Sequence, residues 1–252
     1  MTDALNGQAA DAERTTSGAQ NPLIRKLSNF TKLSAEEEAA LLSALDRPVD
    51  FGASEDIVNS GDATGGVKLL LTGFACRYKL LPDGRRQILD FLIPGDLCDL
   101  HVFLLDRMDH SIAALTDSRI ASPANILRFT DQYPNLTRAL WWTTLVNEAI
   151  AREWVVNLGQ RTAHERMAHL FCELFYRMRS IDAVQGTSYP LPLTQIALAD
   201  TIGLSSVHVN RTLQDLRRDG LISFRGGKLT INNLQALEKA GSFTPEYLHL
   251  RG

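Results

Sequence analysis

The sequence predicts an α+β protein: a jelly-roll-like N-terminal β-roll, then one long helix, then a small C-terminal domain of short helices and a hairpin. Three observations predict this order. Between residues 135 and 180 the pattern is helical, with no proline and with Gly159 as its single glycine. Residues 193–231 combine two amphipathic segments with two strand-like runs. In the first half, glycines recur at the spacing of short strands and turns, at positions 52, 61, 73, 84 and 95.

The composition is ordinary for a globular chain and limits the partners. The net charge is −3, so a nucleic-acid role needs a local basic face rather than bulk charge. Cys76, Cys98 and Cys172 are widely separated and odd in number, which fits a reducing cytosol. No apolar run is long enough to span a bilayer, and the first twenty residues lack the apolar core of a secretory signal. We therefore expect a cytoplasmic protein with no membrane partner.

Local signals place caps and turns inside the β-roll. Ser34 and Glu37 have the spacing of a capping box. LPDGRR at 81–86 places a proline and an Asp-Gly pair where a tight turn needs them. The expected segments are a disordered tail at 1–22, the β-roll at 23–130, the long helix at 131–160, the small domain at 161–240 and a C-terminal tail at 241–252.

The long helix carries apolar residues on more than one face and is expected to break near Gly159. A helix with two apolar faces can pack on its own domain and on a partner helix at once, so we expect a dimerisation helix. A fully buried core helix is the alternative. The apolar residues are Leu140, Trp141, Trp142, Leu145, Val146, Ile150, Trp154 and Val155.

The small domain contains a helix-turn-helix pattern. Gly203 supplies the turn and Ser205 is placed to cap the second helix. Such a second helix enters the DNA major groove with its N-terminal end first. The first helix is marked by Ile196, Leu198, Ala199 and Ile202, and the second buries Val209, Leu213 and Leu216 with Thr212 beside them.

The opposite face of the second helix suits DNA. Arg211 could bond guanine, Asn210 adenine, and Val207 could contact a thymine methyl. LISFRGGKLTI then predicts a hairpin around Gly226-Gly227, which would form a wing. The alternative is a helical hairpin whose polar residues are only solvated. The expected DNA-contacting residues, with phosphate contacts and basic side chains included, are Thr194, Ser205, Ser206, Val207, His208, Asn210, Arg211, Arg217, Arg225 and Lys228.

LTQIALADTIGLSSVHVNRTLQDLRRDGLI closely resembles the helix-turn-helix signature of Crp/Fnr-type transcription regulators. The β-roll with its Gly61-Asp62 and Gly95-Asp96 pairs resembles the family's cyclic-nucleotide-binding-type sensor domain, so the resemblance spans about residues 23–240. It implies a homodimer on a palindromic DNA operator that recruits or blocks RNA polymerase. Family members often carry a glutamate where this chain has Val207, so we expect a different half-site, with Arg211 still the base reader.

The sensor domain departs from the pattern of family members that bind cyclic nucleotides. Those members carry a Gly-Glu pair and an arginine with a hydroxyl neighbour, which hold the phosphate. Here no Gly-Glu pair follows Gly95-Asp96, and the only arginine in reach, Arg107, precedes Met108 and Asp109. We expect no resident cofactor, with a cyclic nucleotide or haem as alternatives. The candidate effector pocket is Cys98, His101, Arg107 and Ser111.

Haem is retained as an alternative because haem-binding members use a cysteine and a histidine in a comparable place, at tighter spacing. A buried free cysteine and a histidine on a turn or helix start is the favoured interpretation of Cys98 and His101. An iron–sulfur cluster is excluded, since three distant cysteines cannot supply four thiolates. A redox switch at Cys98 or Cys172 would need exposure and a positive neighbour, whereas Cys172 lies among apolar residues.

No catalytic or metal-binding residues are predicted. No phosphate loop, nucleophile elbow or metal-ligand run occurs, and the spacing of His164 and His169 does not place them on one helix face. We therefore expect a DNA-binding transcription regulator and not an enzyme. A sensor that acts through a protein partner, or a haem- or redox-sensing member of the same family, is the alternative.

Overall fold

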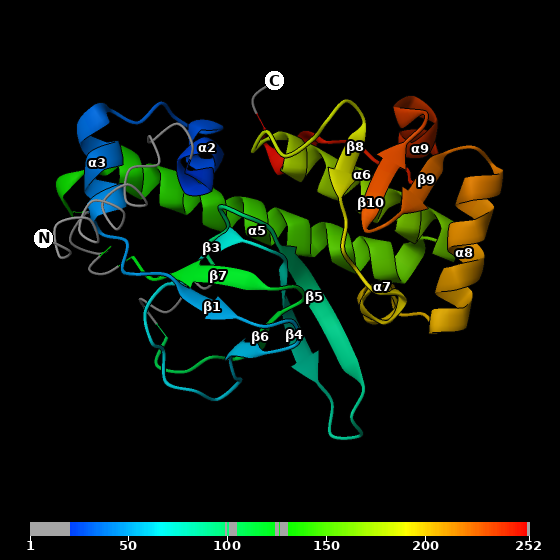
Figure 1. The fold of residues 1–252 in the computed structure, drawn as a ribbon, viewed down its shortest axis with the longest axis horizontal. Helices are drawn as coiled ribbons and strands as arrows, with labels where there is room; N and C mark the ends of the chain where they lie inside the picture. The colour runs from blue at the N-terminus through cyan, green and yellow to red at the C-terminus, as the bar shows by residue number, and fades with distance from the viewer. Residues whose placement is uncertain (1–20, 99, 101–104, 124–125, 127–130, 251–252) are drawn as a thin grey trace, which may run out of the picture.

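The computed structural model describes residues 21–98, 100, 105–123, 126 and 131–250 (Figure 1). It begins with two short helices, α2 (Pro22–Ser28) and α3 (Ala35–Ser43). Asn21 caps α2, so the expected tail at 1–22 gives way to a helix at its last residue, and residues 1–20 lie outside the described part. The capping box of Ser34 and Glu37 at α3 is confirmed.

The predicted β-roll is confirmed as two antiparallel sheets, with strand orders β1-β7-β3 and β2-β6-β4-β5. The turn at 81–86 is also present, because the Leu81 amide donates to the Arg85 carbonyl at 2.8 Å. The strands are β1 (Val49–Phe51), β2 (Asp56–Val58), β3 (Leu69–Thr72), β4 (Ala75–Leu80), β5 (Arg86–Leu92), β6 (Ser111–Ala114) and β7 (Ser118–Ala121).

Gly95 allows the start of α2 to pack closely against the β-roll. Its φ of +92° is unfavourable for residues with a side chain, and a Cβ there would lie 2.5 Å from the carbonyl oxygen of Pro22. This close approach brings Lys26 of α2 into an ion pair with Asp96, the residue after the glycine. The Gly-Asp pair therefore has a structural role at this position, where the turn and the first helix meet.

The long helix is α5 (Pro134–Gln160), which runs along the molecule between the β-roll and the C-terminal domain (Figure 1). The break follows Gly159 by two residues, because Arg161 is extended and Thr162 caps the next helix, α6 (Ala163–Arg179), in a box with Glu165. One face of α5 is buried in its own chain, and the opposite face, with Trp141, Leu145 and Val155, is exposed.

The C-terminal domain contains β8 (Ser188–Pro190), α7 (Gln195–Ile202), α8 (Ser206–Arg218), β9 (Ile222–Arg225), β10 (Lys228–Ile231) and α9 (Leu234–Ala240). The sheet order is β8-β10-β9, so the segment before the helix-turn-helix adds a third strand to the predicted hairpin. Residues 241–250 are not the expected tail. They include the 3-10 helix η3 (Glu246–Leu248), and Phe243 and Leu248 are buried.

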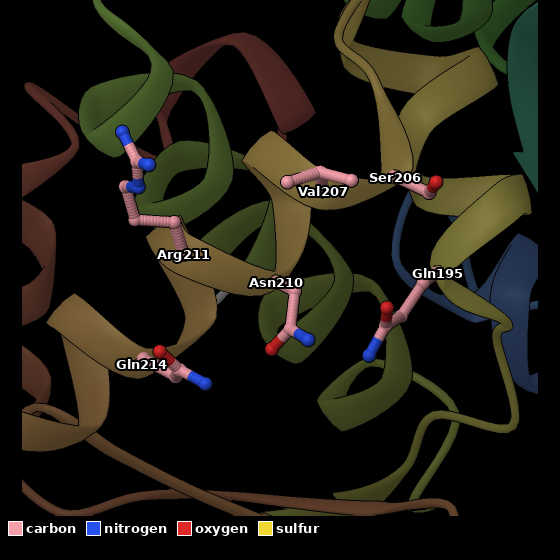
Figure 2. A pocket seen from close by; sticks show the side chains of 6 residues that line it. All are labelled: Gln195, Ser206, Val207, Asn210, Arg211 and Gln214. Carbon is pink, nitrogen blue, oxygen red and sulfur yellow. The ribbon is translucent and has the colours of Figure 1, made fainter.

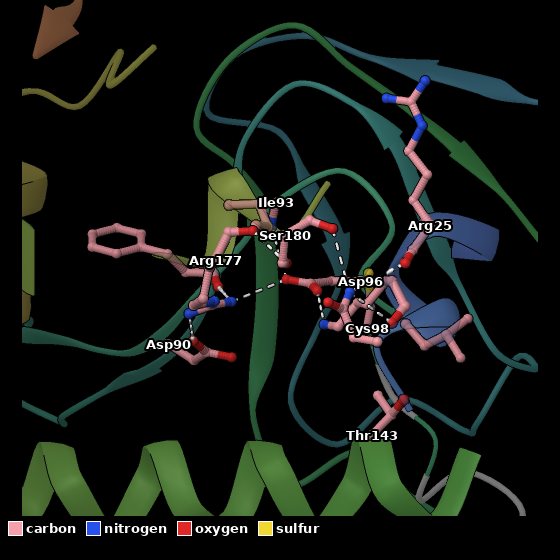
Figure 3. A network of polar contacts seen from close by, with 12 residues as sticks. Arg25, Asp90, Ile93, Asp96, Cys98, Thr143, Arg177 and Ser180 are labelled. Carbon is pink, nitrogen blue, oxygen red and sulfur yellow. Dashed lines mark hydrogen bonds and ion pairs between the residues drawn. The ribbon is translucent and has the colours of Figure 1, made fainter. Parts of the chain in front are cut away.

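A buried charge network joins α6 to the β-roll (Figure 3). The Arg177 guanidinium donates to Asp90 at 3.1 Å, to Asp96 at 3.0 Å and to the Phe91 carbonyl at 2.6 Å. It also pairs with Glu173 on α6 at 3.2 Å. A buried guanidinium is tolerated only when its donors are paired, so these contacts hold α6 in one position on the β-roll.

The network shifts the pKa of two of its buried acids, Asp96 and Glu173. Burial alone raises the pKa of Asp96, but the positive charges of Lys26 and Arg177 outweigh it, and the net shift is downward. At Glu173 burial dominates and raises the pKa, although the carboxylate accepts hydrogen bonds from Trp154 at 3.1 Å and from Tyr247 at 2.8 Å. Glu173 thereby ties α5 and the C-terminal segment to the same centre.

Replacing Arg177 with alanine is expected to lower the free energy of unfolding by about 3–5 kcal/mol, because Glu173 stays buried without its cation and Asp90 and Asp96 each lose one of two. Urea denaturation of the full chain measures this. Arg119→Ala is the control, since Arg119 forms an exposed pair with Asp50 and its loss is expected to cost less than about 1 kcal/mol. Equal losses in the two variants would contradict the role assigned to Arg177.

Candidate nucleic-acid interface

The helix-turn-helix forms where the sequence predicts it. Thr194 caps α7 by accepting from the Ala197 amide at 3.0 Å, and Gly203 ends the helix in the left-handed region with φ 67°. Ser205 then caps α8 by accepting from the His208 amide at 3.3 Å. The expected buried stripe of α8 is confirmed, with Val209, Thr212, Leu213 and Leu216.

One residue of α7 departs from the expected pattern. Ile196 is 62% exposed, and Ala197 takes the buried position beside Leu198 and Ala199. Residue 197 lies on the side of α7 that packs on the rest of the chain, whereas residue 196 lies on the outer side. An apolar side chain therefore stands on the outer surface next to the face that α8 presents.

The exposed face of α8 borders a shallow depression (Figure 2). Val207 is 74% exposed at its rim. The carboxamides of Asn210 and Gln214 face the depression together with that of Gln195, and Arg211 also lines it, with its guanidinium directed away from the three amides. Paired amide donors and acceptors match adenine, a guanidinium matches guanine, and valine methyls match the thymine methyl.

Gln195 and Gln214 line the depression but are absent from the predicted set of DNA-contacting residues. Gln195 belongs to α7, and only the packing of α7 on α8 brings its amide to the face of the second helix. Its position directly after the capping Thr194 is the local signal that could have found it, since the first residues of a capped helix point outward at its end.

The helix N-termini suit phosphate groups. Ser205, Ser206 and His208 are exposed at the start of α8, and Thr194 is exposed at the start of α7. Free backbone amides at such ends bind anions, and hydroxyls add further donors. All four belong to the predicted DNA-contacting residues, and the sequence predicts phosphate contacts for Ser205, Ser206 and His208.

The wing is confirmed as a two-residue turn between β9 and β10, with Gly226 and Gly227 both at positive φ. Arg225 and Lys228 flank the turn and are exposed. Arg217 is not a free cation, because it donates to the Phe224 carbonyl at 3.1 Å and lies over that ring. It links the end of α8 to the wing.

The candidate effector residues are not gathered into a polar pocket in the described part of the chain. The Cys98 side chain is buried with Leu92, Met108 and Ile112 in the apolar interior of the β-roll. Arg107 is exposed and donates to the Gly61 carbonyl at 2.8 Å. The Ser111 hydroxyl accepts from the Ser60 amide, and His101 lies outside the described residues.

The three thiols and the His169 imidazole are buried within the fold. None of the three cysteines forms a disulfide. Burial raises the pKa of Cys76 to about 12 and raises that of Cys172 as well, so neither is a reactive thiolate at neutral pH. Burial lowers the pKa of His169 to about 4, and its ring bonds Gly241 and Tyr247. Among the described residues, no cluster of aspartate, glutamate, histidine or cysteine side chains could hold a metal ion.

The fold and this interface define a winged helix-turn-helix protein with an N-terminal β-roll. The Crp-like helix-turn-helix domain matches residues 165–240, and the cyclic nucleotide-binding domain matches residues 48–123. The nitrogen fixation regulation protein FixK of Bradyrhizobium diazoefficiens is 33% identical over 192 residues, covering 74% of this chain and 78% of the relative. The chain therefore belongs to the Crp/Fnr family of DNA-binding transcription regulators.

Two further similarities agree with this assignment. The transcriptional activator protein FnrL of Cereibacter sphaeroides is 28% identical over 212 residues, covering 81% of this chain and 85% of the relative. The structure of FixK2 from Bradyrhizobium japonicum superposes with a TM-score of 0.69 at 25% identity, covering 79% of this chain and 98% of that chain. No helix in the described part of this chain is long and apolar enough to cross a membrane.

Arg211→Ala is expected to weaken binding to a selected DNA site by about 1–3 kcal/mol, or about 10- to 100-fold, because a bidentate guanine contact is lost. Fluorescence anisotropy measures the Kd for the site selected from a random DNA pool and for unrelated DNA. Arg85→Ala, at the tip of the β4–β5 turn and paired with Asp83, is the control and should bind as wild type. An equal loss on both DNAs would mean that Arg211 contacts phosphate only.

Proposed function

We propose that this protein binds a two-fold symmetric DNA operator as a homodimer and regulates transcription there. The observation that carries the proposal is the pairing of an exposed base-reading face on α8 with an exposed apolar stripe on α5. Trp141 and Val155 are 63% and 72% exposed on that stripe. Large apolar side chains exposed along one helix are typical of a partner surface. A dimer through α5 would give two reading helices related by two-fold symmetry.

The reading face supports a half-site rich in A·T pairs with a guanine. Gln195, Asn210 and Gln214 supply three amides, and Val207 supplies methyl groups at the position where family members often carry glutamate. Arg211 supplies the guanine contact. The wing residues Arg225 and Lys228 add phosphate contacts, which give affinity and salt dependence but no sequence preference.

The output that we propose is activation through RNA polymerase in the cytoplasm, without an enzymatic step. FnrL is named a transcriptional activator, and FixK a regulation protein for nitrogen fixation. The two alignments cover 74% and 81% of this chain. A dimer bound beside a promoter could stabilise polymerase through its exposed surfaces. Transcription in vitro from a promoter with the selected site tests the sign of regulation.

The β-roll residues do not fit a cyclic nucleotide. Such a ligand needs an arginine and a hydroxyl aimed at its phosphate. The Arg107 guanidinium bonds the Gly61 carbonyl instead, and its neighbours are buried Met108 and exposed Asp109. The interior that a base would enter is filled by buried apolar side chains and Cys98. We propose that DNA binding needs neither a cyclic nucleotide nor a bound cofactor.

Selection from a random duplex pool with the purified full chain, and no effector, tests the main proposal. Enrichment of a two-fold symmetric site is expected, with half-site centres about 34–36 Å apart, because two recognition helices of a dimer enter successive major grooves. An asymmetric site would contradict the homodimer. No enrichment from a folded dimer would contradict binding without an effector.

Adding cAMP or cGMP is expected to leave the thermal midpoint of the chain unchanged within about 1 °C, because the β-roll residues that the structure describes form no phosphate site. A nucleotide at about one hundred times its Kd would add about 2.7 kcal/mol and give a clear upward shift. Differential scanning calorimetry measures the midpoint, and the selected DNA serves as the positive control. A saturable shift with either nucleotide would refute the proposal for the β-roll.

A further inference from the structure

One stripe of α5 has the spacing of a coiled-coil seam and a charged centre. Steps of four and three residues alternate along it, which is the 3.5-residue period of paired helices. The stripe is exposed throughout in the described chain, and charged residues interrupt its apolar positions only in the middle. Its residues are Trp141, Leu145, Glu148, Arg152, Val155 and Gly159.

The two charged residues form an ion pair within the helix. The Arg152 Nη1 atom lies 2.6 Å from the Glu148 Oε1 atom, and the side chains are 63% and 62% exposed. An exposed pair of this kind adds little to the stability of one chain. At the centre of a two-fold interface, however, two such pairs would form a layer of four charges with no net charge, in which the glutamate of each copy can bond the arginine of the other.

We propose that Glu148 and Arg152 form a charged layer at the centre of the dimer seam, where the pair of one copy bonds the pair of the second copy. This inference rests on the proposed homodimer. It adds the feature that selects the partner chain and fixes the register of the two α5 helices. A shift of one heptad would place Glu148 against Val155 and Leu145 against Arg152. Each shifted contact would bury a charge against an apolar side chain, so only one register satisfies the whole stripe.

The layer also discriminates against other chains. A related helix with apolar residues at these two positions would bury the Glu148–Arg152 pair of this chain without a charged partner in the other chain, which is unfavourable. The occupant that fits is therefore a second copy of this chain. Leu145 and Val155 on either side of the layer would exclude water from it and strengthen the ion pairs.

Charge reversal tests the layer. Glu148→Arg gives two arginines per chain in the layer, and Arg152→Glu gives two glutamates. Each variant alone is expected to raise the Kd of the dimer by about a hundredfold or more, because four like charges meet. An equimolar mixture of the two is expected to form a heterodimer, and the double variant Glu148→Arg/Arg152→Glu is expected to dimerise again. Sedimentation velocity gives the oligomeric state, and native mass spectrometry identifies the heterodimer.

The exposed pair of Asp50 and Arg119 on the β-roll provides matched controls. Asp50→Arg and Arg119→Glu make the same charge changes away from α5 and should leave the dimer intact. Heterodimer formation by the mixture also shows that both variants fold. If both α5 variants stay dimeric, or if they are monomeric and neither the mixture nor the double variant dimerises, the charged layer is refuted. A monomeric wild-type chain would instead refute the homodimer itself.

Discussion

Arg177 carries a positive charge from α6 into a site lined by Asp90, Asp96 and the Phe91 carbonyl of the β-roll. Removing a guanidinium from water costs several kcal/mol, and only a full set of acceptors offsets it. The guanidinium comes from α6, and its acceptors come from β5 and the turn after it. The sensor domain therefore neutralises a charge that belongs to the first helix of the DNA-binding domain. The position of every later element of the domain follows from this contact.

A second contact joins the same strand to the helix-turn-helix. Arg86 of β5 pairs with Asp200 of α7 at 2.8 Å, and Gln87 donates to the Thr201 carbonyl at 3.1 Å. Figure 1 shows the β4–β5 hairpin beside α7. Because α7 packs on α8, the β-roll sets the direction in which the reading face points. A signal in the β-roll could change DNA binding only by favouring a different arrangement of these contacts.

The two exposed surfaces have different chemistry. The face of α8 is rich in amides and carries one arginine, which suits hydrogen bonds to base edges. The stripe of α5 is apolar with a neutralised charged centre, which suits burial against an identical helix. In a dimer, the α5 stripe would set the distance between the two α8 faces. Affinity for the operator would then depend on how rigidly α5 and α6 are joined.

The sequence by itself determined the features that depend on neighbours three or four residues apart. The capping boxes at Ser34 and Thr162, the left-handed Gly203 and the turn at Gly226-Gly227 are local, because a side chain or a φ angle settles each one. The capping box at Thr162 was not predicted, but its residues are visible in the sequence. The buried stripe of α8 is likewise a matter of helical period.

Tertiary structure alone decided the rest. Arg177 meets acids more than eighty residues away, and no local pattern shows that an arginine in an amphipathic helix will be buried. The burial of residues 243–248, the exposure of Ile196 and the approach of Gln195 to α8 also depend on how elements pack. Two apolar faces of α5 look alike in sequence, and only the packing of the C-terminal domain against one of them leaves the other open. Periodicity shows that a face is apolar, but the partner that covers it is chosen by contacts between residues distant in the chain.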